Sequence, residues 1–294
     1  MTDAVRLYQG PFGRAALLDS DHDLMTHAHP QCHVLIKAGG ADAAYQVRDR
    51  KVALSADSMV LVNAWEPHLK FQPPAGERSM VLVLCVEPLW LAEYDSQLSG
   101  SGMPDFFPSP SAAMPPSVRK LADRLIAEML SCAPGEEPSR DIEVALSDLM
   151  LSLTHLYAMR RSWVDTYRLQ MRQRTDARIT RAIRYLGEHL GEVLNCEDLA
   201  RMHHLSRQHF FSLFRQCTNV SPILYLNTLR MESAFRTLGG SAATVNVVAN
   251  DLGFSEPHHF TRFFRRNLGI PPSEYRRTVS LVQPDGGRQI PTSW

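Results

Sequence analysis

The C-terminal third of the chain repeats one residue pattern at a fixed spacing. Aromatic, arginine and proline positions recur fifty residues apart: Phe210, Phe214, Arg215, Pro222 and Tyr225 match Phe260, Phe264, Arg265, Pro272 and Tyr275. Around both copies, apolar residues recur at spacings of three and four, which is typical of helices with one buried face. In the second copy Gly253 interrupts this period. A helix, a glycine turn and a second helix form a helix-turn-helix unit, so the sequence predicts two such units in tandem.

Each unit contains one helix whose outward face would be free to meet DNA. At spacings of three and four these outward positions are Gln208, Phe211 and Ser212 in the first unit, and His258, Thr261 and Arg262 in the second. In the major groove, Gln pairs with adenine, Arg pairs with guanine, and an aromatic ring packs on the thymine methyl group. Neighbouring basic residues are better placed for phosphates, namely Arg207, His209, Arg215, Arg265 and Arg266. For any single position the alternative is a solvated helix face.

The charge distribution supports DNA as a partner, although the formal net charge of the chain is zero. Residues 172–278 contain 15 Arg, no Lys and nine acidic residues, while residues 1–171 carry an excess of six acidic groups. A cationic segment is what a phosphate-facing surface requires.

The tandem units strongly resemble the DNA-binding domain of AraC/XylS-type bacterial transcription activators. The stretch that begins at Pro222 carries Tyr225, Arg230, Ala234 and Leu238 at positions similar to the family's pattern. Asn219 stands where the family usually has glycine, and Asn tolerates the left-handed conformation better than other residues. The resemblance implies an all-α domain over residues 176–278, with promoter or operator double-stranded DNA and RNA polymerase as partners.

The N-terminal part is predicted to be β-rich, with short apolar runs separated by Gly and Pro turns. Its histidines, His27, His29, His33 and a later His68, resemble the pattern of a cupin domain over roughly residues 10–90. His33 stands where metal-binding cupins usually carry glutamate. Three interpretations remain open: a divalent metal site for Zn or Fe, the lining of a small-molecule effector pocket, or structural histidines. No metal or other cofactor is certain.

Two amphipathic helices are predicted between the domains. Their apolar stripe includes Leu146, Leu149 and Leu153, which we expect at a homodimer interface because AraC-type proteins often dimerise there. The alternative is that the stripe only covers the β-domain. The Gly- and Pro-rich stretch from Leu89 to Pro116 is predicted to lack regular elements.

The predicted fold class is therefore α+β multidomain. Residues 1–100 form a cupin-like β-barrel that binds an effector, residues 101–165 a connector and helical dimerisation segment, and residues 166–175 a linker; the DNA-binding domain follows, and residues 279–294 form a disordered tail. We expect a cytoplasmic, ligand-responsive transcription regulator, most simply an activator, that is not an enzyme and has no membrane partner. The alternative function is a metal-dependent cupin enzyme, dioxygenase-like, with an accessory DNA-binding domain.

Overall fold

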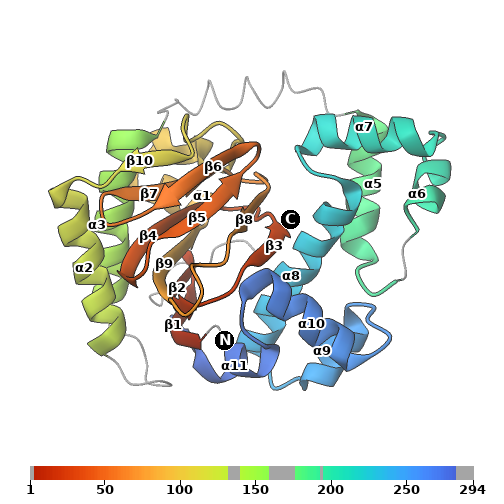
Figure 1. The fold of residues 1–294 in the computed structure, drawn as a ribbon. Coiled ribbons are helices and arrows are strands. Elements are labelled where there is room, and N and C mark those ends of the chain that lie inside the picture. Colours follow the sequence, from red (N-terminus) through yellow and green to blue (C-terminus); the bar gives the residue numbers. More distant parts are fainter. Residues whose placement is uncertain (1–2, 132–139, 159–175, 193–194, 283–294) are drawn as a thin grey trace.

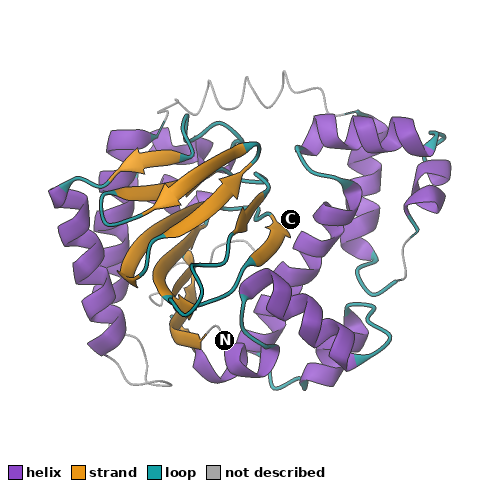
Figure 2. Cartoon of the chain, viewed as in Figure 1, coloured by secondary structure: helices purple, strands orange, loops and turns teal. Residues whose placement is uncertain are grey.

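The structure is a computed structural model that describes residues 3–131, 140–158, 176–192 and 195–282. A β-rich N-terminal domain is covered on one side by two helices and packs on its other side against an all-helical C-terminal region (Figures 1 and 2). The predicted α+β organisation is thereby confirmed. The predicted linker, residues 166–175, lies outside the described residues. No helix in the described ranges is long and apolar enough to cross a membrane.

The β-domain consists of two sheets that face each other. The larger has the order β10 (Ser111–Ala113), β7 (Ser58–Val62), β4 (Cys32–Gly40), β9 (Ser79–Val86), β2 (Gly13–Ser20), β1 (Asp3–Gly10) and β11 (Val279–Leu281). The smaller has the order β3 (Leu24–His27), β8 (His68–Lys70), β5 (Ala43–Val47) and β6 (Arg50–Leu54). Side chains from both sheets, such as Leu35, Tyr45 and Val81, form one buried cluster. The β-rich domain is as predicted, but its described strands form two hydrogen-bonded sheets and not one closed barrel.

The helices α2 (Pro116–Ser131) and α3 (Arg140–Tyr157) cover the larger sheet. Leu146, Leu149 and Leu153 of α3 are each 0% exposed, and they belong to the same core as the strands beneath them. They are therefore not accessible to a second copy, and their assignment to a dimer interface is wrong. Burial against the chain's own sheet and burial against a partner require the same apolar stripe.

The stretch predicted to lack regular structure contains several short elements. These are α1 (Pro88–Tyr94), a 3-10 helix (Ser96–Gly102) and β10. Pro88 stands in the first turn of α1, where proline is tolerated because no intrahelical hydrogen bond is lost. Trp90 and Leu91 are buried in the core of the domain, which holds this helix in place.

Seven helices of the described residues form the C-terminal region: α5 (Ala177–Glu188), α6 (Cys196–Met202), α7 (Arg207–Thr218), α8 (Pro222–Gly240), α9 (Val245–Asp251), α10 (Pro257–Leu268) and α11 (Pro272–Thr278). The pairs α6–α7 and α9–α10 are the two predicted helix-turn-helix units, and α8 joins them. Asn219 and Gly269, fifty residues apart, end α7 and α10 with φ angles of 65° and 91°. Both are left-handed, as expected at these positions.

The chain returns to the N-terminal domain after α11. Strand β11 pairs in parallel with β1, with Leu7 opposite Val279, and the Val282 amide donates to the Gln9 carbonyl at 2.8 Å. The prediction that the tail is disordered from residue 279 is therefore wrong for its first residues, because β1 offers a free sheet edge. Residues 283–294 lie outside the described residues. Leu7 and Leu18 share a buried cluster with Met231 and Phe235 of α8, so the two domains have a common core.

Candidate functional sites

The helices α7 and α10 each bury one face and expose the other. Phe210 and Phe214 of α7, like Phe260 and Phe264 of α10, are 0% exposed. Of the six predicted base-contacting residues, Gln208, Ser212, His258 and Arg262 are exposed, and Phe211 and Thr261 are half-buried. All five predicted phosphate-contacting residues are exposed: Arg207, His209, Arg215, Arg265 and Arg266. The structure thus brings the predicted residues to the outward faces of two equivalent helices, and whether they contact DNA stays a prediction.

Close contacts fix the two units to each other. Gly253, with φ 75°, lies so near the loop after α5 that a Cβ there would come within 2.5 Å of the Gly191 carbonyl oxygen. The Arg230 guanidinium of α8 donates to the carbonyl oxygens of Leu190 at 3.0 Å and Glu192 at 2.9 Å. These contacts join the α5 loop, α8 and the turn of the second unit. The pair of recognition helices is therefore presented as one body.

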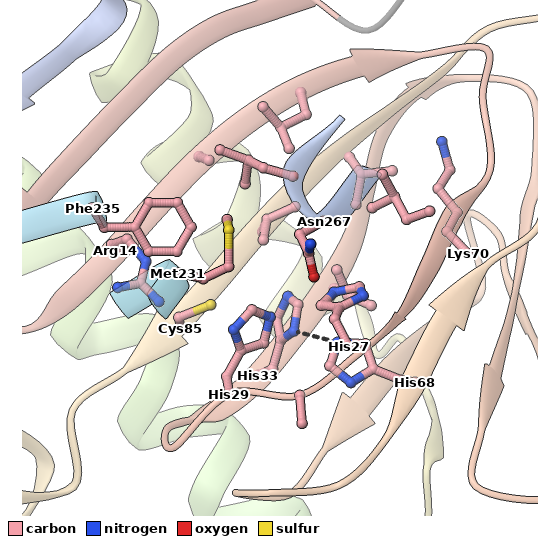
Figure 3. Close-up of a pocket in the computed structure, with 18 of the residues that line it drawn as sticks. Arg14, His27, His29, His33, His68, Lys70, Cys85, Met231, Phe235 and Asn267 are labelled. Carbon is pink, nitrogen blue, oxygen red and sulfur yellow. Dashed lines mark hydrogen bonds between the residues drawn. The ribbon is translucent and has the colours of Figure 1, made fainter. Parts of the chain in front are cut away.

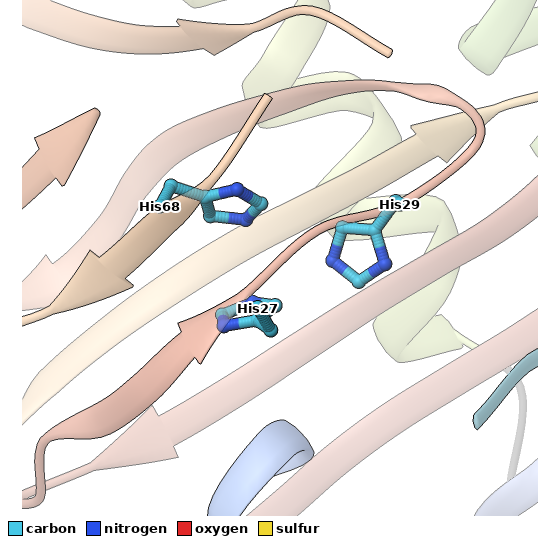
Figure 4. A group of neighbouring side chains, drawn as sticks. All are labelled: His27, His29 and His68. Atoms are coloured by element: carbon cyan, nitrogen blue, oxygen red, sulfur yellow. The ribbon is translucent and has the colours of Figure 1, made fainter. Parts of the chain in front are cut away.

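The four predicted histidines gather in a pocket between the domains (Figure 3). His27 ends β3, His29 follows it, His33 lies on β4 and His68 begins β8. Ring centroids are 4.3 Å apart for His27 and His68, 5.0 Å for His29 and His33, and 5.1 Å for His33 and His68. His29 is 15% exposed, and the other three are more deeply buried. Figure 4 shows the rings of His27, His29 and His68 around one space.

Burial keeps these imidazoles neutral. Burial lowers the pKa of His27, and it lowers the pKa of His33 to about 3 with a further contribution from the charge of His27. Burial and repulsion by the neighbouring rings lower the pKa of His29 and His68 well below the ordinary value. Neutral imidazole is the form that binds metals and accepts hydrogen bonds. At neutral pH each ring of the cluster therefore has one acceptor nitrogen and one N–H donor.

Hydrogen bonds orient three of the rings. His27 Nδ1 lies 2.7 Å from the Met25 carbonyl oxygen, and His68 Nδ1 lies 2.9 Å from that of Glu66. His33 Nδ1 lies 3.2 Å from His68 Nε2. His33 Nε2 is buried and has no hydrogen-bond partner.

The pocket has further polar residues that the sequence analysis missed. Cys85 of β9 lies with His29 and His33, and the ligand atoms of these three residues are all within 4.8 Å of one another. At the other end Lys70 is 3% exposed, its Nζ has no hydrogen-bond partner, and burial lowers its pKa to about 8. In the sequence Cys85 lies inside an apolar strand, and Lys70 has no motif around it. Cys85 and Lys70 are recognised as pocket residues only because the two sheets face each other in the fold.

The C-terminal region closes the pocket with helix α8. Arg14 of β2 makes two hydrogen bonds to the Glu232 carboxylate, at 2.7 and 2.8 Å, and lies over the Phe235 ring at 4.3 Å. Burial alone would lower the pKa of Arg14, but the charge and hydrogen bonds of Glu232, together with Cys85 and Tyr275, more than offset it, and the pKa is raised. Thr228 Oγ1 donates to the Ala28 carbonyl at 3.3 Å. The pocket has a cavity volume of about 70 Å³, which is room for several waters or a small ligand.

A second contact joins the histidine loops to the first helix-turn-helix unit. Trp65 stacks on Tyr225 of α8 with ring centroids 4.3 Å apart and planes 5° from parallel. Its backbone has φ 56°, and its amide donates to the His29 carbonyl at 2.7 Å. Tyr225 in turn packs on Phe214, in the core of that unit. Contacts from both domains thus hold the backbone of Trp65 in the left-handed conformation.

Comparisons with known proteins agree with this architecture. A family model described as a helix-turn-helix domain matches residues 199–278. The HTH-type transcriptional regulator YobQ of Bacillus subtilis is 38% identical over 98 residues, which is 33% of this chain and 41% of YobQ. The HTH-type transcriptional activator RhaS of Escherichia fergusonii is 31% identical over 160 residues, or 54% of this chain and 53% of RhaS. The chain thus matches about half the length of these relatives.

One solved protein matches nearly the whole fold. ToxT from Vibrio cholerae O395 superposes with a TM-score of 0.52 over 94% of this chain and 96% of its own, at 11% identity. A second ToxT structure, bound to an unsaturated fatty acid, has a TM-score of 0.50 over 90% of this chain and 94% of its own, at 13% identity. At such identity the match shows a shared two-domain fold. The relatives reported above are named as regulators or activators, not as enzymes.

Proposed function

The chain belongs, through its C-terminal domain, to the AraC/XylS-type helix-turn-helix regulators, and on that premise we propose that it is a sequence-specific regulator of transcription controlled by a small-molecule effector. The observation that carries the proposal is the pair of exposed, equivalent recognition helices held together by α8, Arg230 and Gly253. One chain would place them in successive major-groove turns, about 34 Å apart along the duplex. Activation through contact with RNA polymerase is part of the proposal.

Selection of DNA fragments by the full-length protein tests the DNA-binding part. Selected sites should contain two conserved blocks separated by about one helical turn, because the two helices are fixed in relation to each other. Affinity for a selected site should fall steeply as salt rises, since arginines release counterions from the phosphates. Failure to enrich any sequence, or an affinity that does not change with salt, would contradict the proposal.

The effector site in this proposal is the pocket around the four histidines. Its walls come from both domains, with Thr228, Met231 and Phe235 of α8 opposite the strands. A ligand that fits only one arrangement of the strands and α8 would shift the equilibrium between DNA-binding states. The fatty acid in the ToxT structure supports a ligand role for this fold, without naming the ligand here. Candidate effectors would be tested by their effect on thermal stability, which a true ligand raises by mass action.

We propose homodimerisation as well, through a surface other than the one predicted from the sequence. The outer faces of α2 and α3 expose Leu130, Val144 and Leu156 at 44%, 48% and 50%. Light scattering of the wild type and of Val144→Asp would test this surface. A wild type that is monomeric at micromolar concentration would refute the dimer.

A further inference from the structure

The hydrogen bonds around His33 determine which of its nitrogens has a free lone pair. The Glu66 carbonyl oxygen can only accept, so the 2.9 Å contact requires a proton on His68 Nδ1. A neutral His68 ring then has its lone pair at Nε2, and His33 Nδ1 must donate to it across 3.2 Å. A neutral His33 consequently has its lone pair at Nε2. That atom is buried and has no hydrogen-bond partner, and His33 is one of the residues that line the pocket.

This hydrogen-bond relay, from His33 through His68 to the Glu66 carbonyl, separates the histidines into two roles. Both nitrogens of His68 are engaged, so His68 is not available as a ligand without breaking a hydrogen bond. Two sets of three residues have ligand atoms within 4.8 Å of one another: His27 with His29 and His68, and His29 with His33 and Cys85. The relay weakens the first set. It strengthens the second, because a hydrogen bond to the far nitrogen fixes the orientation of a ligating imidazole and raises its basicity.

We propose that His29, His33 and Cys85 bind a thiophilic metal ion, of which Zn²⁺ and Cu⁺ are the two probes. The proposal rests on the effector pocket of the proposed function and gives the chemical class of its ligand. Two imidazoles and one thiolate suit these ions better than Mg²⁺ or Ca²⁺, which prefer oxygen ligands. Around a tetrahedral zinc ion with bonds of about 2.0–2.3 Å, ligand atoms stand roughly 3.3–3.8 Å apart. Side-chain movements of about 1 Å would bring the ligand atoms of His29, His33 and Cys85 to that spacing.

We infer that a fourth ligand comes from the C-terminal region, because Met231 of α8 lines the same pocket as Cys85, His29 and His33 (Figure 3). Thioether sulfur is a soft ligand of the kind that accompanies thiolate and imidazole in copper sites. When the ion binds, the Cys85 S–H bond breaks, a metal–sulfur bond forms and the proton leaves to solvent; no electron is transferred. A bound ion would thereby connect strands β4 and β9 to α8, the helix that joins the two recognition units.

Spectroscopic titration of the full-length protein tests the site. Reduced, metal-free protein is titrated with Co²⁺ as an optical substitute for Zn²⁺, and Zn²⁺ or Cu⁺ is then used to displace it. We expect one equivalent per chain and a near-ultraviolet sulfur-to-cobalt charge-transfer band. Cys85→Ala should abolish the band, and Cys85→Ala and His33→Ala should each weaken binding by more than about 100-fold. His68→Ala should weaken it by about 10- to 100-fold, as expected for a residue that orients a ligand.

Two further variants provide the controls. Cys32→Ala removes a buried thiol from the neighbouring register position of β4 and should leave the band and the affinity unchanged. His27→Ala should retain binding, which separates the two sets of ligands. X-ray absorption of the zinc-loaded wild type adds a readout that requires no variant to fold, since it should show the thiolate sulfur of Cys85 at about 2.3 Å.

Three results would overturn the proposal. They are a charge-transfer band that survives in Cys85→Ala, loss of binding in His27→Ala with retention in Cys85→Ala, and no binding of Co²⁺, Zn²⁺ or Cu⁺ by the wild type. DNA binding by the same samples is measured in parallel. A protein that binds DNA but no metal refutes only the metal site, whereas a protein that binds metal but no DNA refutes the regulator.

Discussion

The ion pair between Arg14 and Glu232 offers the sharpest test of how the domains are held together. It joins β2 to α8 through two hydrogen bonds, and its side chains are only 12% and 16% exposed. Glu232→Gln keeps the size of the side chain but removes its charge, so the Arg14 cation remains buried without a counterion. Breaking one side of a buried pair costs about 3–5 kcal/mol, and the partial exposure here favours the lower end, about 3 kcal/mol.

The double variant Arg14→Met with Glu232→Met removes both charges together. Replacing a whole buried pair by apolar side chains of similar size is often nearly neutral. We therefore expect the double variant to be more stable than Glu232→Gln, although it carries more substitutions. In a protein of this size a loss of about 3 kcal/mol lowers the Tm by roughly 6–12 °C.

Denaturant unfolding followed by circular dichroism would measure Glu232→Gln beside the wild type, Arg14→Met, Glu232→Met and the double variant. The free energies of unfolding of the last four proteins form a double-mutant cycle that isolates the interaction between the two side chains. Hydrogen exchange of α8 and β2 would show whether the loss is confined to the domain contact. If Glu232→Gln costs less than about 0.5 kcal/mol, or if the variants are simply additive, the pair does not hold the domains together.

Two further predictions concern single side chains. Arg262→Ala should relax the preference for one base pair by about 1–3 kcal/mol. Arg266→Ala should weaken binding to all sequences and reduce the slope of affinity against salt by about one. The reverse pattern in binding to selected sites would contradict the assignment of Arg262 to a base and of Arg266 to a phosphate. Lys70→Met should stabilise the protein at pH 7 by at most about 3 kcal/mol, because the buried Lys70 has a pKa of about 8 in the native state, below its ordinary value. Below pH 8 the native wild type bears the full cost of that charge, and between pH 8 and about 10.5 the cost disappears, so the advantage of Lys70→Met should shrink as pH rises through this range. Unfolding curves of both proteins at pH 7 and pH 10 would check this, and an unchanged advantage at pH 10 would refute it.

The sequence was most informative where local geometry and function impose the same pattern. The fifty-residue offset identified both helix-turn-helix units, and the left-handed φ of Asn219 follows from the place of the helix end. The spacing of the four histidines also predicted that they gather. Arg14 and Glu232 could not be paired in advance, because no local pattern connects residues 218 positions apart. The prediction that the stripe with Leu149 lies at a dimer interface failed for a different reason. Periodicity shows that a helix face is buried, but it does not show what covers that face.

The parallel pairing of β11 with β1 has a consequence for the order in which the molecule is made. During synthesis β1 emerges long before its partner β11, which follows only after the described helices of the C-terminal region. Until then the β-rich domain has an open strand edge, and such edges pair readily with other chains. A chain that ends before residue 279 would therefore leave the edge of β1 open to other chains, whereas a chain that includes β11 covers this edge itself. The edge of β1 is thus covered only in molecules whose chain continues past the helices of the C-terminal region.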